Sequence, residues 1–451
     1  MADIEWINPI ESRMSIEIGN LVRPILSYRD FYYKQGPYRK ERKEYTVSLM
    51  RLEDGHFYFL TGFIPKITNH LKKRGIDFTT DYFPDSIPTN SPSLGGIILE
   101  SAQRDLIKAM LTSQRGYIEA PTGTGKTIMG LGALSGIGKT NPHLWLCHTK
   151  DLMLQTGKVA ERFGFDVGYV GDGKTQLEQD LTIATRQSFI KVTEPRKFTS
   201  VIIDETHHLT TFNGEYARIL DRLYETPIRL GLTATPPPDG TKQSFVLEGY
   251  LGPLIERKTM DEWIDTGLLS TARVRVLKSP INHGLKDRRK YADVYREGVV
   301  ENIPKNSMIA RKAKEHIQKG DSVLIMVTQI THGELLERLL KSIDVPCKFI
   351  YSITEGNARE EVKQALNLKH LKCVISSTIW REGVNIPELN IIINAGGGKT
   401  EIPVLQAVGR GLRRTPTKTH LIVYDVFDES HYYLISHFGN RMAIYSEMGW
   451  L

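Results

Sequence analysis

The sequence predicts an α/β protein in which two doubly wound parallel sheets follow one another along the chain. Short apolar runs typical of buried strands alternate with helix-like segments, first between about residues 93 and 265 and again from 266 onward. The strand-like runs are 116–120, 144–147, 181–184, 201–203, 228–232, 323–327, 373–376, 390–393 and 421–424. Two tandem lobes are therefore expected, the first over 93–265 and the second over 266–451.

The first 92 residues show a different pattern and predict a small α+β domain. Alternating apolar residues in 45–50 and 56–60, with a turn at 53–55 between them, predict a hairpin. A basic helix is expected over 64–74. The proline- and glycine-rich stretch 84–96 is interpreted as the linker to the first lobe.

The charge of the chain favours a polyanionic partner. Its 451 residues carry a net charge of +7, and the isoelectric point is about 9.0. Residues 29–74 hold eleven lysines and arginines against five acidic residues, and 273–319 hold thirteen against five, with tyrosines among them. Cations can neutralise phosphates and aromatic rings can stack on bases, so both stretches are candidate nucleic-acid contacts. The alternative is a solvated charged face.

Composition argues against several other classes of protein. No apolar run is long enough to span a membrane, and the N-terminus lacks the apolar core of a signal peptide, so an intracellular protein is expected. Cys147, Cys347 and Cys373 each stand alone in an apolar run. That pattern is typical of buried thiols and not of a disulfide or zinc framework.

Residues 120–127 read APTGTGKT, the pattern of a loop that wraps the phosphates of a nucleotide. A strand-like run precedes the loop and a helix-like run follows it, so backbone N–H groups at the helix N-terminus would face the phosphates. Lys126 adds positive charge, and the Thr127 hydroxyl can bind Mg²⁺. The expected nucleotide-binding residues are Pro121, Thr122, Gly123, Thr124, Gly125, Lys126 and Thr127.

A second segment, 133–140, matches the same pattern but stands in the wrong context. Asn141, Pro142 and an apolar strand follow it, so no helix stands behind the loop to offer a cluster of N–H groups. This segment is interpreted as the C-cap of a helix followed by a turn.

An acidic motif, Asp204-Glu205-Thr206-His207, directly follows the strand-like run 201–203. Parallel sheets bind ligands in the crevice at the carboxyl ends of their strands. Asp204 is therefore expected to hold Mg²⁺ beside the phosphate loop, and Glu205 to orient or deprotonate the attacking water. A zinc site is not expected, because the adjacent His207 and His208 point in different directions.

The order and spacing of these motifs resemble those of the superfamily-two DExH helicases, from about Leu99 to Thr415. The resemblance implies two RecA-like lobes that use ATP and Mg²⁺. It also implies that Thr233-Ala234-Thr235-Pro236 links the state of ATP to contacts with the strand. The further nucleotide contacts that it implies are Gln103 and Gly383, with Arg410 and Arg413 stabilising the charge of phosphoryl transfer. The nucleic-acid contacts that it implies are Thr149, Lys150, Thr185, Arg186, Gln187 and Thr378.

Within this family, residues 231–269 resemble the DNA-dependent members, and the small basic N-terminal domain resembles that of phage branch-migration helicases of the UvsW type. The resemblance implies a monomeric ATP-dependent DNA helicase or translocase that acts on branched or forked DNA in recombination, repair or replication. An RNA helicase and a duplex-DNA translocase that leaves the strands paired remain open. A binding module that uses ATP only as a switch is disfavoured by the intact Glu205 and the two arginines.

Overall fold

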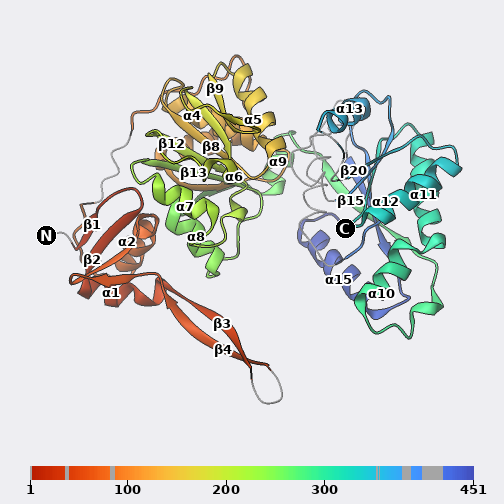
Figure 1. Cartoon of the computed structure of the whole chain (residues 1–451), viewed down its shortest axis with the longest axis horizontal. Coiled ribbons are helices and arrows are strands. Elements are labelled where there is room, and N and C mark those ends of the chain that lie inside the picture. The colour runs from red at the N-terminus through yellow and green to blue at the C-terminus, as the bar shows by residue number, and fades with distance from the viewer. Residues whose placement is uncertain are drawn as a thin grey trace. The chain divides into compact units, whose positions relative to one another are not determined.

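The computed structural model describes residues 3–35, 40–81, 87–351, 354, 356–377, 388–398 and 420–451. The chain divides into two compact units, one of residues 1–121 and 125–259 and the other of residues 122–124 and 260–451 (Figure 1). The first unit holds the small N-terminal domain and the first lobe, and the second unit holds the second lobe. Both lobes are parallel-sheet α/β structures, so the predicted fold class is confirmed.

The N-terminal domain is built on a four-stranded antiparallel sheet. Its strands, in the order β1-β2-β6-β5, are β1 (Ile4–Trp6), β2 (Glu11–Ser15), β6 (His56–Leu60) and β5 (Arg51–Glu53). Two helices, α1 (Ile16–Val22) and α2 (Ile64–Lys73), pack their apolar residues into the same core as Phe57 and Phe59 of β6. The basic helix predicted over 64–74 is thus confirmed.

The predicted pairing of 45–50 with 56–60 is wrong. The turn at 53–55 joins β5 to β6, whereas residues 45–48 belong to β4 (Lys40–Ser48), which pairs with β3 (Ser27–Gln35). Alternation in a strand shows that it has two faces but does not identify its partner. Here β6 lies between β2 and β5 and buries Phe57 and Phe59, whereas most residues of β4 are exposed.

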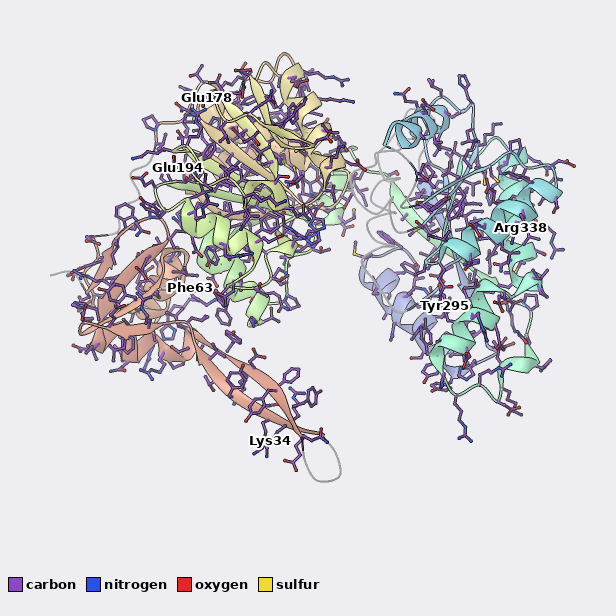
Figure 2. All side chains as sticks on the ribbon, viewed as in Figure 1. Lys34, Phe63, Glu178, Glu194, Tyr295 and Arg338 are labelled. Atoms are coloured by element: carbon purple, nitrogen blue, oxygen red, sulfur yellow. The ribbon has the colours of Figure 1, made fainter. Side chains whose placement is uncertain are left out.

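Strands β3 and β4 form a separate two-stranded antiparallel ribbon. Its register runs from Ser27 opposite Ser48 to Gln35 opposite Lys40. The ribbon projects from the N-terminal domain, and Lys34 lies near its far end (Figure 2). Nine residue pairs at about 3.4 Å per residue give a ribbon roughly 27 Å long.

The first lobe contains an eight-stranded sheet. Its strands, in the order β10-β9-β11-β8-β12-β13-β7-β14, are β10 (Lys174–Thr175), β9 (Val167–Gly171), β11 (Leu181–Thr185), β8 (His143–Cys147), β12 (Ser200–Asp204), β13 (Ile228–Thr233), β7 (Arg115–Glu119) and β14 (Leu254–Arg257). Every neighbouring pair is parallel except β10 with β9. Strands β8, β11, β12 and β13 are buried along their whole length, which explains their continuous apolar runs.

Helices connect these strands and cover the sheet. They are α3 (Ser101–Ser113), α4 (Lys126–Ile137), α5 (Lys150–Arg162), α6 (Arg186–Phe189), α7 (Glu215–Arg222) and α8 (Lys242–Leu251), with a 3₁₀ turn, η3 (Thr206–His208), after β12. In Figure 1, α7 and α8 lie on the opposite side of the strands from α5. The lobe is therefore doubly wound, as its alternating pattern predicts.

The N-terminal domain packs onto the first lobe, which contributes a residue to the core of the domain. Phe245 of α8 is buried in the core of the N-terminal domain, where its ring lies 6.3 Å from that of Phe63. Beside it, Lys66 of α2 forms a 2.6 Å ion pair with Glu248 of α8. Buried Arg115 of β7 donates a 2.8 Å hydrogen bond to the carbonyl of Pro9. The domain is therefore packed onto the lobe and not merely tethered to it.

The second unit contains a six-stranded parallel sheet. Its strands, in the order β15-β20-β19-β16-β18-β17, are β15 (Thr271–Lys278), β20 (His420–Phe427), β19 (Ile391–Asn394), β16 (Val323–Met326), β18 (Cys373–Ser376) and β17 (Lys348–Ile350). The helices described here are α9 (Met260–Asp265), α10 (Tyr291–Tyr295), α11 (Ile303–Gln318), α12 (Ile330–Ser342), α13 (Gly356–Asn367) and α15 (Tyr432–Glu447). This parallel sheet confirms the second α/β lobe of the predicted fold class.

The three cysteines are buried free thiols, as predicted. Burial is the main cause that raises the pKa of Cys147, and the nearby Asp204 carboxylate raises it further. Cys147 is therefore a neutral thiol at physiological pH, although it lies next to the candidate site. Among the described residues, no helix has both the length and the apolar character needed to cross a membrane.

Candidate ATP site and nucleic-acid interface

The phosphate loop leaves β7 and enters α4 with the backbone that its sequence predicts. Gly123 and Gly125 have φ angles of 92° and 86°, a left-handed conformation that residues with a Cβ atom rarely adopt. Lys126 begins α4, and its ammonium donates a 3.3 Å hydrogen bond to the Ala120 carbonyl, so the side chain lies over the loop. Thr127 follows in the first turn of α4. These features fit a bound nucleotide phosphate.

Gln103 also reaches the loop. A Cβ atom on Gly125 would lie 2.8 Å from Nε2 of Gln103, so the amide rests against the loop backbone. The Gln103 Oε1 atom accepts a hydrogen bond from the Glu100 N–H at 3.0 Å, which closes the capping box of α3. The structure thus brings Gln103 to the phosphate loop and fixes its orientation. Its predicted contact with adenine stays a prediction.

The acidic motif lies at the carboxyl end of β12. Asp204 is buried, and its Oδ1 atom accepts a 3.0 Å hydrogen bond from the Glu205 N–H. Glu205 has a φ of 53°, a left-handed conformation that is uncommon outside glycine and costs free energy. The two carboxylates have different neighbours, since Asp204 accepts from the Glu205 N–H and Glu205 Oε2 lies beside His207, as expected if the two side chains have different roles.

Strand order places the loop and the acidic motif at one edge of the sheet. Strand β13 lies between β7 and β12, with Leu232 opposite both Ile118 and Asp204. The two strands are therefore about 10 Å apart, at two strand spacings. An oxygen-ligated Mg²⁺ held by Asp204 and Thr127 suits this crevice, because both donors are hard oxygens.

The segment that follows β13 is connected to Glu205 through His207. The His207 Nδ1 atom lies 3.4 Å from Glu205 Oε2 and 3.5 Å from Thr233 Oγ1. Thr233 Oγ1 in turn accepts a 3.2 Å hydrogen bond from the Thr235 N–H. A displacement of Glu205 would therefore move His207 and, through it, the Thr233–Pro236 segment.

The second match to the loop pattern is a helix end, as predicted. Gly138 caps α4 with a φ of 123°, and β8 begins five residues later. Lys139 donates its ammonium proton to the Phe163 carbonyl at 2.5 Å and lies over the Phe165 ring. This lysine therefore stabilises the packing of the helix end against residues 163–165.

The nucleic-acid candidates of the first lobe lie together after β8 and β11, which are neighbours in the sheet. Thr149 and Thr185 cap α5 and α6, where their hydroxyls accept hydrogen bonds from Leu152 and Ser188 N–H groups at 3.3 Å. Two candidates follow these caps. Lys150 forms a 2.5 Å ion pair with Asp172, and Gln187 is exposed.

Stacked histidines join this cluster to the acidic motif. The rings of His148 and His208 are parallel, with 3.6 Å between their centroids, and His207 lies 4.3 Å from His208. Arg186 donates a 2.7 Å hydrogen bond to His148 Nδ1. An unbroken path of contacts thus runs from Glu205 to Arg186. No motif spacing signalled the stack, which depends on β8 and β12 being neighbours in the sheet.

We expect His208→Ala to weaken the stimulation of ATP hydrolysis by nucleic acid, because the change removes the ring that supports His148 and Arg186. Coupling between two sites typically corresponds to a factor of about 5 to 150, and the ratio of stimulated to basal rate should fall within that range. Steady-state phosphate release with and without DNA measures the ratio. His283→Ala, at an exposed histidine in the second unit, is the control. An unchanged ratio in His208→Ala would show that the stack is only structural.

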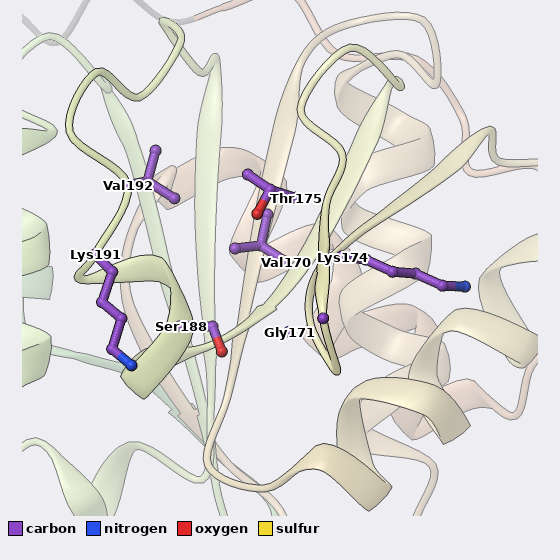
Figure 3. Close-up of a pocket in the computed structure, with 8 residues that line it drawn as sticks. Val170, Gly171, Lys174, Thr175, Ser188, Lys191 and Val192 are labelled. Carbon is purple, nitrogen blue, oxygen red and sulfur yellow. The ribbon is translucent and has the colours of Figure 1, made fainter.

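A cavity of about 290 Å³ adjoins the same cluster. It lies between the β9–β10 turn and the end of α6 (Figure 3) and is lined by Val170, Gly171, Gly173, Lys174, Thr175, Ser188, Lys191 and Val192. The lining contains no residue of the phosphate loop, so this cavity is separate from the candidate ATP site. Ser188, which hydrogen-bonds Thr185, connects it to the nucleic-acid candidates.

Four candidates of the second lobe, Thr378, Gly383, Arg410 and Arg413, lie outside the described residues. The structure does describe the glycines at 396–398, which precede the two arginines in the sequence. Tyr295 donates a 2.7 Å hydrogen bond to the Gly396 carbonyl, and Arg441 donates one of 2.7 Å to that of Gly398. Arg441 is itself held in a buried 2.7 Å ion pair with Asp425.

Two family models match the chain in succession. The model described as "Type III restriction enzyme, res subunit" matches residues 96–238, and "Helicase conserved C-terminal domain" matches residues 305–415. The DNA 3'-5' translocase XPB2 of Sulfurisphaera tokodaii is 28% identical over 365 residues, which cover 72% of this chain and 81% of the relative. The ATP-dependent DNA helicase uvsW of Enterobacteria phage T4 is 24% identical over 268 residues, which cover 57% of this chain and 52% of the relative.

Among solved structures, a fragment of a putative HsdR subunit of a type I restriction enzyme from Vibrio vulnificus YJ016 has the same fold. The TM-score is 0.58 at 17% identity, and the match covers 91% of this chain and 76% of that one. The two family models, in this order, define an ATP-dependent nucleic-acid helicase with two RecA-like lobes. The chain belongs to the superfamily-two helicases and is related to UvsW of phage T4.

Proposed function

We propose that this helicase is a DNA motor that acts on branched or forked DNA, in recombination, repair or replication. The observation that carries the proposal is the packing of a basic N-terminal domain onto the first lobe through Phe245 and Lys66. This packing supports the proposal, because it would hold a second candidate DNA-binding surface in a fixed position relative to the candidate Arg186. The names of two relatives, a DNA translocase and a DNA helicase, support DNA as the substrate.

The chemistry follows from the residues at the sheet edge. Lys126 and the first N–H groups of α4 would neutralise phosphate charge, and Thr127 and Asp204 would hold Mg²⁺, which supplies further positive charge when bound. Glu205 orients the attacking water. Arg410 and Arg413 complete the charge stabilisation from the second lobe, so that hydrolysis depends on both lobes. The path from Glu205 to Arg186 then connects hydrolysis to the strand contacts.

The test is the ATPase rate of the full chain with four matched activators: single-stranded DNA, blunt duplex DNA, a four-way junction, and RNA of the same sequence. We expect the junction to stimulate most per nucleotide, because it can occupy the first lobe and the N-terminal domain together. Equal or greater stimulation by RNA would instead identify an RNA helicase. Stimulation by duplex with no strand displacement from a labelled fork would identify a translocase that leaves strands paired.

A further inference from the structure

We propose that the β3–β4 ribbon binds unpaired DNA bases by stacking them on its exposed aromatic side chains. The inference rests on the proposed function, namely that the protein acts on DNA. It specifies the part of a branched substrate that the N-terminal domain would recognise. That part is the bases of a single-stranded arm, in addition to the phosphates.

The aromatic side chains of the ribbon are exposed to solvent, except for the one at its base. Phe31, Tyr32, Tyr33 and Tyr45 are 45%, 53%, 61% and 47% exposed. By contrast, Phe57, Phe59 and Phe63 in the core of the same domain are no more than 5% exposed, so this domain does bury the aromatic residues that stabilise its core. A cluster of exposed aromatic rings on a projecting ribbon is typical of a binding surface.

The register of the ribbon determines which rings and cations share a face, and both faces carry rings and cations. Tyr33 lies opposite Arg42 and shares a face with Phe31, over which the Arg42 guanidinium lies at 4.3 Å. Tyr32 lies opposite Lys43 on the other face, and its ring is 6.0 Å from that of Tyr45. Each face thus carries a pair of aromatic rings with a cation beside it.

This combination favours single-stranded nucleic acid over other occupants. Bases offer flat rings to an aromatic side chain, and the adjoining phosphates offer negative charge to lysine and arginine. Residues 27–48 contain six lysines and arginines against three acidic residues. The ion pairs Arg42–Glu44 and Lys43–Glu41, at 3.1 and 3.3 Å, are about half exposed and therefore weak. A blunt duplex would hide its base faces, and charged residues along both strands disfavour the addition of another strand.

The base of the ribbon is anchored to the first lobe. Tyr28 is buried against Phe245 of α8, with ring centroids 6.0 Å apart, and Asp30 lies 3.7 Å from the Lys242 ammonium. The exposed rings therefore project from a fixed point on the motor. A base held by Tyr32 or Tyr45 would be held at a set distance from the strand contacts of that lobe.

The test replaces Tyr32 and Tyr45 with threonine, which keeps strand propensity but removes the rings. Affinity of the full chain is measured by fluorescence anisotropy with three DNAs: a fork with unpaired arms, the same fork with abasic arms, and a blunt duplex. We expect a loss of about tenfold or more on the natural fork, since stacking of one base contributes a factor of roughly 5 to 150. The abasic fork and the duplex should bind the variant and the wild type equally.

The matched control is Lys34→Gln with Lys43→Gln, which removes charge from the same ribbon. This pair should flatten the slope of log affinity against log salt by roughly 0.7 for each single-strand phosphate that is no longer neutralised, and should weaken the natural and abasic forks alike. The threonine variant should keep the wild-type slope. Equal thermal unfolding midpoints show that all three proteins are folded.

Two outcomes would overturn the stacking proposal: wild-type affinity of the threonine variant for the natural fork, or an equal decrease in affinity on abasic arms. The proposed function fails separately. If wild-type protein prefers an RNA fork to the DNA fork, DNA is the wrong substrate, whereas the threonine variant still reports whether the ribbon stacks on bases.

Discussion

Lys126→Ala should reduce ATP turnover by about a hundredfold or more, the loss expected when a charge that stabilises the transition state is removed from a preorganised site. The ammonium lies over the phosphate loop, with its hydrogen bond to the Ala120 carbonyl at 3.3 Å. Phosphate release in the presence of saturating DNA measures the effect. DNA affinity without nucleotide should hold, because the strand candidates lie after β8 and β11 and not at the loop.

The chain supplies a matched control within the same helix–turn segment. Lys139 occupies the lysine position of the second pattern match, but its ammonium donates a hydrogen bond to the carbonyl of Phe163. Lys139→Ala should keep turnover within a few fold of the wild type. Near-normal turnover in Lys126→Ala, or a collapse in Lys139→Ala, would show that the phosphate site is assigned to the wrong loop.

Glu205→Gln should slow hydrolysis by about 10²- to 10⁴-fold, because the amide cannot accept the proton of the attacking water. ATP binding should persist, since the loop and Asp204 are unchanged, and affinity for DNA in the presence of ATP should hold or rise. Single-turnover hydrolysis and binding of a fluorescent ATP analogue separate the two effects.

The control for this change is Glu225→Gln, at a glutamate that pairs with Lys197 on the surface at 2.9 Å. It should leave hydrolysis unaffected. Hydrolysis by Glu205→Gln at the wild-type rate would remove Glu205 from the chemistry. Loss of ATP binding together with hydrolysis would point to a structural role for the left-handed turn at this residue.

The strands that carry the ATP site could be predicted from the sequence because their signal is local. Strands β12 and β13 are buried along their whole length, so each appears as an uninterrupted apolar run. Edge strands give a weaker signal: β14 and β15 are not among the predicted strands, and each lies at the edge of its sheet with partly exposed residues, including Arg273 and Arg275. An edge strand is free to carry charge on the side that faces water.

The histidine stack could not be predicted for a different reason. His148 and His208 belong to loops 60 residues apart, and they meet only because β8 and β12 are neighbours in the sheet. Strand order is a property of the whole fold. The same holds for the partner of β4, which local alternation assigned incorrectly to 56–60.

The packing of Phe245 into the N-terminal domain also determines how that domain should be studied. Truncation of residues 1–90 would uncover Phe245 and leave Glu248 without Lys66. The resulting loss of stability would obscure any effect on DNA binding. Substitutions on the exposed part of the ribbon avoid this problem, because their side chains contribute little to the core.

The ribbon that pairs only within its own two strands has an evolutionary consequence. Its backbone hydrogen bonds are exchanged between β3 and β4, so two residues added to or removed from each strand would preserve which side chains share a face. Each such step would change the reach of the ribbon by about 7 Å without altering the lobe on which it stands. Insertions and deletions here can therefore change the length of the ribbon in evolution while the two ATP-binding lobes stay unchanged.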